Sequence, residues 1–138
     1  MTADEGYTLR SPADPGSLER VHALLEQVWA GHADVVADDR MRFEIGVTEI
    51  AGNIVEHAAA LRPIEFQLGV RVHDDRLEAR FRDPGQRMEV DLVAAGMPDA
   101  LAESGRGLAL ALAVVDELTY RRDGADNHWL IVRRRAPA

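Results

Sequence analysis

The chain has 138 residues, of which 46% are hydrophobic and 29% charged, and its formal net charge is −8. These values are typical of one globular domain with a hydrophobic core and argue against a disordered chain. The negative charge argues against broad, nonspecific binding to nucleic acid. Because the sequence has no cysteine, it can form no disulfide, no thiolate zinc site and no cysteine nucleophile.

The chain shows no sign of a membrane or secretory segment. The N-terminal sequence MTADEGYTLR lacks the apolar stretch of a signal peptide, and no apolar run approaches the roughly 20 residues that span a bilayer. We interpret the basic run at residues 133–135 as a solvated C-terminal end. The expectation is a soluble, cytoplasmic protein that contacts neither membrane nor nucleic acid directly.

The first half of the chain predicts a strand followed by two helices. The residues YTLR predict a short edge strand, and the turn-rich SPADPG follows. Apolar residues then recur at three- and four-residue spacing from Leu18 to Trp29, which predicts an amphipathic helix with Ser17 as its N-cap. After a loop over GHADVVADD, a second helix is predicted over about residues 39–60. Its core stripe comprises Phe43, Val47, Ile50, Ile54 and Ala58.

In the second half the hydrophobic period changes from that of a helix to that of a strand. Apolar residues alternate over 64–72 and 77–81 around Asp74 and Asp75, which predicts a β-hairpin. The weakly patterned residues 84–105 form a long stretch of the kind that is usually functional or mobile. RGLALALAVVDEL then predicts a third helix, and TYRRDGADNHWLIVRRR a second hairpin that turns at Asp123 and Gly124. This order predicts an α/β (α+β) two-layer sandwich, with helices covering one face of a mostly antiparallel sheet.

Three places could carry chemistry, and the first is a polar stripe on the second helix. Glu49, Asn53 and His57 follow one another at four-residue spacing, so they share a stripe about 80° wide beside the apolar face. Glu49 could act as a general base, and the amide oxygen of Asn53 could bind Mg²⁺, which prefers oxygen ligands. Taken alone, an ordinary solvent-facing stripe is the more common explanation.

The second place is the end of the strand that closes with Asp83, which Pro84 and Gly85 follow at once. A carboxylate held at a strand end can accept a hydrogen bond from an exocyclic amine, and a glycine lets backbone approach a ligand closely. A plain turn is the alternative, because Asp-Pro-Gly is common turn chemistry.

The third place is the start of the third helix, where Gly105 and Gly107 flank Arg106. Free N–H groups at the positive end of a helix suit a phosphate, and Arg106 could add a charge. A flexible loop end capped by Ser104 or Gly105 is the alternative. The sequence has no G-x-x-x-x-G-K-[ST], so it contains no P-loop motif.

In this order, the polar stripe, Asp83-x-Gly85 and Gly105-x-Gly107 resemble the GHKL ATPases with the Bergerat fold. The short chain and the segment GRGLALALAVVDELTYRRDG look most like the anti-sigma factor serine kinases, the partner-switching regulators of bacteria. The resemblance runs from about residue 8 to 134. It implies one histidine-kinase-like ATPase domain over residues 1–138, without repeats or a linker.

The resemblance also implies a role for each site residue, with ATP and Mg²⁺ as cofactors. Asn53 would hold the Mg²⁺ that bridges the ATP phosphates, and Glu49 would orient and deprotonate the serine hydroxyl of a partner. Asp83 would accept a hydrogen bond from the adenine amino group, and Gly85 would shape the pocket around it. Gly105 and Gly107 would donate backbone hydrogen bonds to the phosphates.

The implied partners are an anti-anti-sigma (STAS-domain) protein, which would be phosphorylated on serine, and a sigma factor, which would be sequestered; a homodimer is also possible. Three departures from the family pattern leave an alternative open. Arg87 occupies the second glycine position of D-x-G-x-G, Glu103 stands where some relatives have an arginine, and no aromatic residue follows His57 closely. The alternative is a non-catalytic Bergerat-fold regulator that binds a sigma factor or another partner. A fragment-like histidine kinase ATPase domain is less favoured, because no dimerisation and phosphoacceptor helices precede it.

Overall fold

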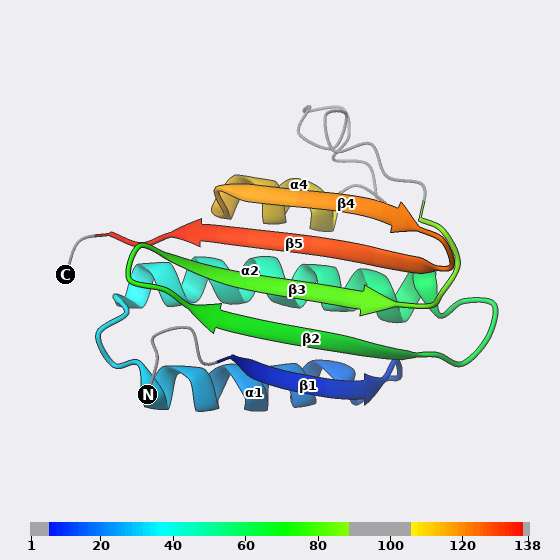
Figure 1. Cartoon of the computed structure of the whole chain (residues 1–138), viewed down its shortest axis with the longest axis horizontal. Coiled ribbons are helices and arrows are strands. Elements are labelled where there is room, and N and C mark those ends of the chain that lie inside the picture. Colours follow the sequence, from blue (N-terminus) through cyan, green and yellow to red (C-terminus); the bar gives the residue numbers. More distant parts are fainter. Residues whose placement is uncertain (1–5, 89–105, 137–138) are drawn as a thin grey trace.

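The computed structural model describes residues 6–88 and 106–136, which form a five-stranded sheet with helices on one face (Figure 1). The strand order is β1-β2-β3-β5-β4, and every neighbouring pair is antiparallel. The elements are β1 (Tyr7–Pro12), α1 (Ser17–Gly31), α2 (Ala37–Asn53), the π-helix η1 (Ile54–Ala58), β2 (Glu65–Val72), β3 (Arg76–Asp83), α4 (Arg106–Val114), β4 (Glu117–Asp123) and β5 (Asp126–Arg134). The predicted α/β sandwich with a mostly antiparallel sheet is therefore confirmed.

The core lies between the sheet and the helices, because alternate side chains of each strand point to that side. The apolar residues predicted for β2 and β3 are all buried, as is the predicted core stripe of the second helix. Phe66 and Phe81 sit on neighbouring strands with ring centroids 5.9 Å apart, and Trp129 of β5 is 1% exposed. The hairpin turn predicted at Gly124 is also confirmed, since this glycine has the left-handed φ of 59°.

The predicted helix over residues 39–60 was wrong in one respect, because it is α-helical only to Asn53. The chain continues as η1, where Ala59 N donates to Ile54 O at 3.0 Å across five residues. Short π-helical turns are frequent at functional sites. The third helix also ends earlier than predicted, at Val114.

Ser17 is not the N-cap of α1, as the sequence had suggested. Gly16 takes that position, and the buried Ser17 hydroxyl donates to Pro12 O at 2.8 Å and accepts from Asp14 N at 2.9 Å. The hydroxyl therefore fixes the turn between β1 and α1 rather than the first turn of the helix.

The basic C-terminal run is not simply solvated, contrary to expectation. Arg133 Nε donates to the buried carboxylate of Asp39 at 3.0 Å, and Ala136 N donates to the same carboxylate at 2.8 Å. Arg135 is 9% exposed and pairs with Asp34 at 2.7 Å. These contacts attach the end of β5 to α2 and to the loop before it. In the described part of the chain, no helix is long and apolar enough to cross a membrane.

Candidate functional site

Asp83, the last residue of β3, points to the helix-covered side of the sheet and is fully buried. Its Oδ1 accepts hydrogen bonds from Gly85 N at 2.8 Å and from Asn127 Nδ2 at 2.9 Å. Its Oδ2 has no partner among the described residues. Burial raises the pKa of the Asp83 carboxyl above its ordinary value, although the hydrogen bonds from Asn127 and Gly85 oppose this shift. A buried acceptor without a donor is unfavourable in the free protein and is available to a ligand N–H.

Gly85 fits this place because no side chain would. A Cβ at Gly85 would overlap the backbone carbonyl of Ala58 and lie 2.8 Å from Asp83 Oδ1. The next residue adds two hydrogen bonds to η1. Gln86 N donates to Ala58 O at 3.1 Å, and Gln86 Nε2 donates to His57 O at 2.5 Å. The Asp83 loop, residues 83–86, is therefore packed against the carbonyl end of η1.

Asn127 of β5 holds the other side of the Asp83 loop and is not among the residues predicted from the sequence. Besides its bond to Asp83, its Nδ2 donates to Gln86 O at 2.9 Å. Its Oδ1 accepts from Tyr120 OH at 2.5 Å and from Arg122 Nη1 at 3.0 Å, and Arg122 Nη1 also donates to Gly85 O at 2.7 Å. A signal was present in the sequence: Asn127 is a polar residue at a strand position that alternates in step with the buried Trp129 and Ile131.

Glu49 lies on α2 against the first turn of α4. A Cβ at Gly107 would lie 2.6 Å from Glu49 Oε2, so the absence of a side chain there leaves room for the carboxylate. Burial raises the pKa of the Glu49 carboxyl. Asn53, one turn further along, is half-buried, and its Nδ2 is buried without a partner in the described structure.

The predicted site residues thus form two groups that η1 joins. Glu49 and Gly107 lie together at one end of α2. The Asp83 loop contacts the end of η1, which continues α2 beyond Asn53, through Gly85 and Gln86. Figure 1 shows the end of β3, the end of α2 and the start of α4 directed toward the same side of the molecule. The site can therefore offer a buried hydrogen-bond acceptor, an amide, a carboxylate of raised proton affinity and a helix N-terminus.

The remaining predicted features of the site stand apart or lie outside the described residues. The His57 side chain is 45% exposed with Nε2 3.8 Å from Glu56, and its contribution to the site is its backbone carbonyl. Arg87 is exposed. Gly105 and Glu103 lie outside the described residues, and so does the side chain of Arg106, although its backbone begins α4.

Two solved structures share this fold. The crystal structure of the RsbU and RsbW domains of Rv1364c from Mycobacterium tuberculosis is 20% identical, with a TM-score of 0.66 over 97% of this chain and 34% of that one. The histidine kinase domain from the Erythrobacter litoralis EL346 blue-light activated histidine kinase is 18% identical, with a TM-score of 0.55 over 80% of this chain and 59% of that one. The chain therefore spans about a third of the first structure and three fifths of the second.

The family comparison covers most of the chain. The search among curated proteins finds no match. The model of the histidine kinase-like ATPase domain matches residues 11–133, which include all the described parts of the site. With the fold, this match identifies the chain as a member of the histidine kinase-like ATPase domain family.

Proposed function

We propose that the protein is an ATP-dependent serine kinase of a bacterial partner-switching system. It would phosphorylate an anti-anti-sigma (STAS-domain) partner and sequester a sigma factor. The family supports ATP as the nucleotide. The resemblance of the sequence to anti-sigma factor serine kinases, and the fold similarity to a structure that contains an RsbW domain, support the choice of partners. The single observation that carries the proposal is the buried, unpartnered Oδ2 of Asp83 beside a glycine that has no room for a side chain.

The Asp83 loop fits an adenine ring. The exocyclic amine of adenine is a donor, and Asp83 Oδ2 is a buried acceptor that no described residue satisfies. Asn127 and Gly85 N hold the other oxygen, so the carboxylate is already oriented before a ligand binds. Such a preformed acceptor selects for an N–H at that point and against a carbonyl.

Asn53 and the start of α4 fit the phosphate end of the nucleotide. Asn53 would offer its amide oxygen to Mg²⁺, and Gly107 would offer its backbone N–H to phosphate oxygens. The described residues include no group of three or more His, Asp or Glu that could hold a metal ion, so phosphate and water would have to complete a shell around a cation on Asn53. When bound, Mg²⁺-ATP supplies the transferable phosphoryl group and neutralises its charge.

Glu49 fits the role of a base for the partner's serine. Burial raises its pKa, so the carboxylate holds a proton more readily than an exposed glutamate would. It would accept a hydrogen bond from the serine hydroxyl and orient the oxygen. It would take the hydroxyl proton as the oxygen bonds to the γ-phosphorus and the bond from that phosphorus to ADP breaks, which releases ADP. The close approach of Gly107 leaves Glu49 next to the phosphate-facing turn of α4.

Nucleotide binding is tested first, by thermal unfolding of the whole chain with and without Mg²⁺-ADP. Ligand at 100 times its Kd should add about 2.7 kcal/mol to the free energy of unfolding. Asp83→Asn replaces the acceptor Oδ2 with a donor amide, so we expect it to weaken binding by about 100-fold or more. Asp126→Asn, on the outer side of the same strand pair, is the matched control and should bind as the wild type does. An unchanged Kd in Asp83→Asn would remove the adenine contact.

Phosphotransfer is tested with Mg²⁺-ATP and a candidate STAS-domain partner protein. Glu49→Gln keeps the shape of the side chain but loses the base, and we expect phosphorylation to fall about 10²- to 10⁴-fold with little change in ADP binding. Glu56→Gln, an exposed carboxylate on η1, should leave the rate unchanged. Equal rates in the wild type and Glu49→Gln would exclude Glu49 as the base.

A second candidate is a non-catalytic regulator that binds its partner without nucleotide. Arg87 favours it, because this exposed arginine occupies the position of a family glycine just beyond the Asp83 loop. The thermal unfolding measurement with Mg²⁺-ADP also distinguishes the kinase from the non-catalytic regulator. A flat response of the wild type at millimolar Mg²⁺-ADP would favour the regulator, provided that the chain still binds its partner.

A further inference from the structure

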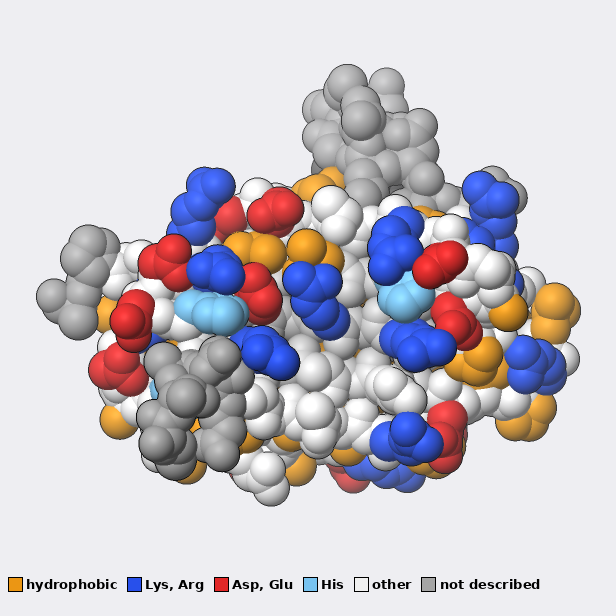
Figure 2. Space-filling view, in the orientation of Figure 1, with side chains coloured by type: hydrophobic (Ala, Val, Ile, Leu, Met, Phe, Trp, Pro, Cys, Tyr) orange, Lys and Arg blue, Asp and Glu red, His pale blue; other side chains and the backbone are white. Residues whose placement is uncertain are grey.

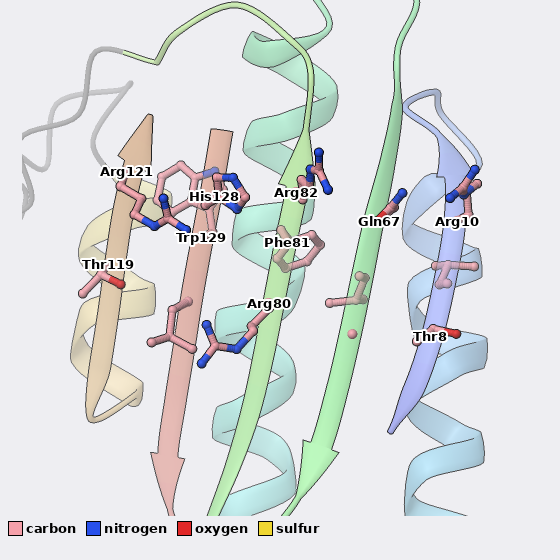
Figure 3. A pocket seen from close by; sticks show the side chains of 14 residues that line it. Thr8, Arg10, Gln67, Arg80, Phe81, Arg82, Thr119, Arg121, His128 and Trp129 are labelled. Carbon is pink, nitrogen blue, oxygen red and sulfur yellow. The ribbon is translucent and has the colours of Figure 1, made fainter. Parts of the chain in front are cut away.

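The face of the sheet opposite the helices has a composition that the nucleotide site does not explain. All 16 basic residues of this acidic chain are arginines. Figure 2 shows arginine and histidine side chains over the exposed strands, with acidic side chains beside several of them, and Figure 3 shows the hollow that the basic side chains border. This hollow, the open-face hollow, has a volume of about 600 Å³. Its lining includes Arg10, Arg80, Arg82, Arg121 and His128 and, among the described residues, no Asp or Glu.

The strand register places these cations in order. Arg10 pairs with Gln67, Gln67 with Arg82, Arg82 with His128, and His128 with Arg121, so one row crosses all five strands. With neighbouring strands about 4.8 Å apart, the row is about 19 Å long. Arg80 lies two residues before Arg82 on β3. It belongs to the next row of paired residues, which ends at Thr119 on β4. Figure 3 shows the labelled side chains arranged in this way.

Where the arginines that line the hollow form ion pairs with described residues, the arginine side chains are exposed. Arg82 contacts Asp126 at 2.8 Å, Arg121 contacts Asp123 at 3.4 Å, and both arginine side chains are more than half exposed. Exposed pairs of this kind are weak and exchange readily for other carboxylates. Arg80 forms no hydrogen bond or close ion pair with a described residue, although its charge helps to lower the pKa of the nearby Glu78 carboxyl. Arginine is also the cation best suited to bind carboxylates through two parallel hydrogen bonds.

We propose that the open-face hollow is a docking site for an acidic segment of a partner protein, with several carboxylates along an extended or helical stretch. The charge of the row is complementary to such a segment and opposite to the net charge of the rest of the chain. A second copy fits less well, because two such rows would face each other with like charge. A long nucleic acid also fits less well, because Asp123 and Asp126, two residues from the row on β4 and β5, would repel a phosphate backbone. The proposal does not depend on the nucleotide site, which lies on the other face.

The test is fluorescence anisotropy of the full chain with a labelled polyglutamate peptide of about 8 residues, which spans the row when extended. We expect binding that weakens as salt rises. The variant Arg80→Glu/Arg121→Glu should bind at least about tenfold more weakly. The control Arg20→Glu/Arg42→Glu, on α1 and α2, makes the same change of net charge, from −8 to −12, because each substitution contributes −2. It should bind within about twofold of the wild type.

Three outcomes would overturn the proposal: equal loss of binding in the two double variants, tighter binding of a single-stranded DNA of similar length at the same arginines, or self-association of the wild type that only the open-face variant abolishes. Circular dichroism checks that each variant folds, and Arg80→Gln/Arg121→Gln replaces the open-face variant if it does not. The open-face variant should keep its Mg²⁺-ADP thermal response, and Asp83→Asn should keep its peptide binding. Failure of this proposal can therefore be told from failure of the proposed kinase.

Discussion

The two faces of the same sheet use polar side chains in opposite ways. On the helix-covered face, Asp83, Asn127 and Asp39 are buried and held by backbone or side-chain hydrogen bonds in one geometry. On the open face, Arg82 and Arg121 are more than half exposed and form pairs that water screens. The first arrangement suits a ligand of fixed shape such as a nucleotide. The second suits a flexible charged segment, which needs attraction more than precise fit.

The sharpest way to test this comparison is to remove a buried charge on the helix-covered face. Asp39→Ala leaves Arg133 without its closest carboxylate and Ala136 N without its acceptor, so we expect a loss of about 3 kcal/mol in the free energy of unfolding. Urea unfolding of the whole chain measures it. Asp38→Ala, whose side chain is 58% exposed, is the neighbouring control and should cost below about 1 kcal/mol. Equal losses would mean that burial does not distinguish the two carboxylates.

Substitution of two glycines compares the packed side of the sheet with its open face without any change of charge. Gly85→Ala forces a methyl group against the carbonyl of Ala58, and we expect a loss of about 2 kcal/mol together with weaker nucleotide binding. Gly69→Ala, in the middle of the open face, meets nothing within 4 Å, so it should be neutral or stabilising by up to about 1 kcal/mol. Thermal unfolding of both variants decides the matter. A tolerant Gly85 would show that the Asp83 loop can move away from η1.

The sequence predicted those parts of the molecule that depend on local periodicity. Alternation in β2 and β3 and the apolar stripe of α2 follow from burial of one face, which each segment expresses by itself. The positions of Asp83 and Gly85 at a strand end were also predictable, because a strand that ends in Asp-Pro-Gly must turn there. The family resemblance then suggested a purpose for these residues that their spacing alone did not.

The rest depends on contacts between residues far apart in the chain. Asn127 and Asp83 are 44 positions apart, and Arg133 and Asp39 are 94 apart, so no local pattern connects either pair. The π-helical turn after Asn53 likewise meets a distant segment, because Gln86 of the Asp83 loop donates to the carbonyls of His57 and Ala58. Side-chain periodicity predicts a helix at η1 but not which kind. The row of cations on the open face has no local pattern either, because its arginines come from three separate strands and its histidine from a fourth.

The pH dependence of stability distinguishes the buried Asp83 from an exposed carboxylate by the sign of its slope. Burial raises the folded-state pKa of Asp83, so folding favours its protonated form. Its contribution to stability is therefore greatest below the unfolded-state pKa and falls as pH rises through the raised folded-state pKa. Exposed Asp14, whose pKa the hydrogen bond from Arg20 lowers, has the opposite slope: its contribution is present at higher pH and is lost on acidification.

Asp83→Asn should remove the contribution of Asp83 to the pH dependence of stability and leave the contributions of the other groups unchanged. We expect the variant to gain stability relative to the wild type as pH rises through the acidic range. The gain should be smaller than the losses expected for Asp39→Ala and Gly85→Ala. Thermal unfolding in a series of buffers, without nucleotide, measures the difference between the two proteins. Asp14→Asn serves as the control and should lose stability relative to the wild type over the same rise in pH. A difference for Asp83→Asn that is flat or of opposite sign would mean that its carboxylate is better stabilised than its unpartnered Oδ2 indicates.

The smallest effect is expected on the open face, in the pair formed by Arg82 and Asp126. Although Arg82 donates from both Nε and Nη2 to the same oxygen, its side chain is 57% exposed, and a double-mutant cycle with Arg82→Ala and Asp126→Ala should give a coupling below about 0.5 kcal/mol. High salt should reduce it further. A coupling well above about 1 kcal/mol that survives salt would show that this pair is as fixed as the buried one at Asp39. The arginine would then be committed within the chain, and an acidic partner would have to displace Asp126 at a cost that the docking site could not recover.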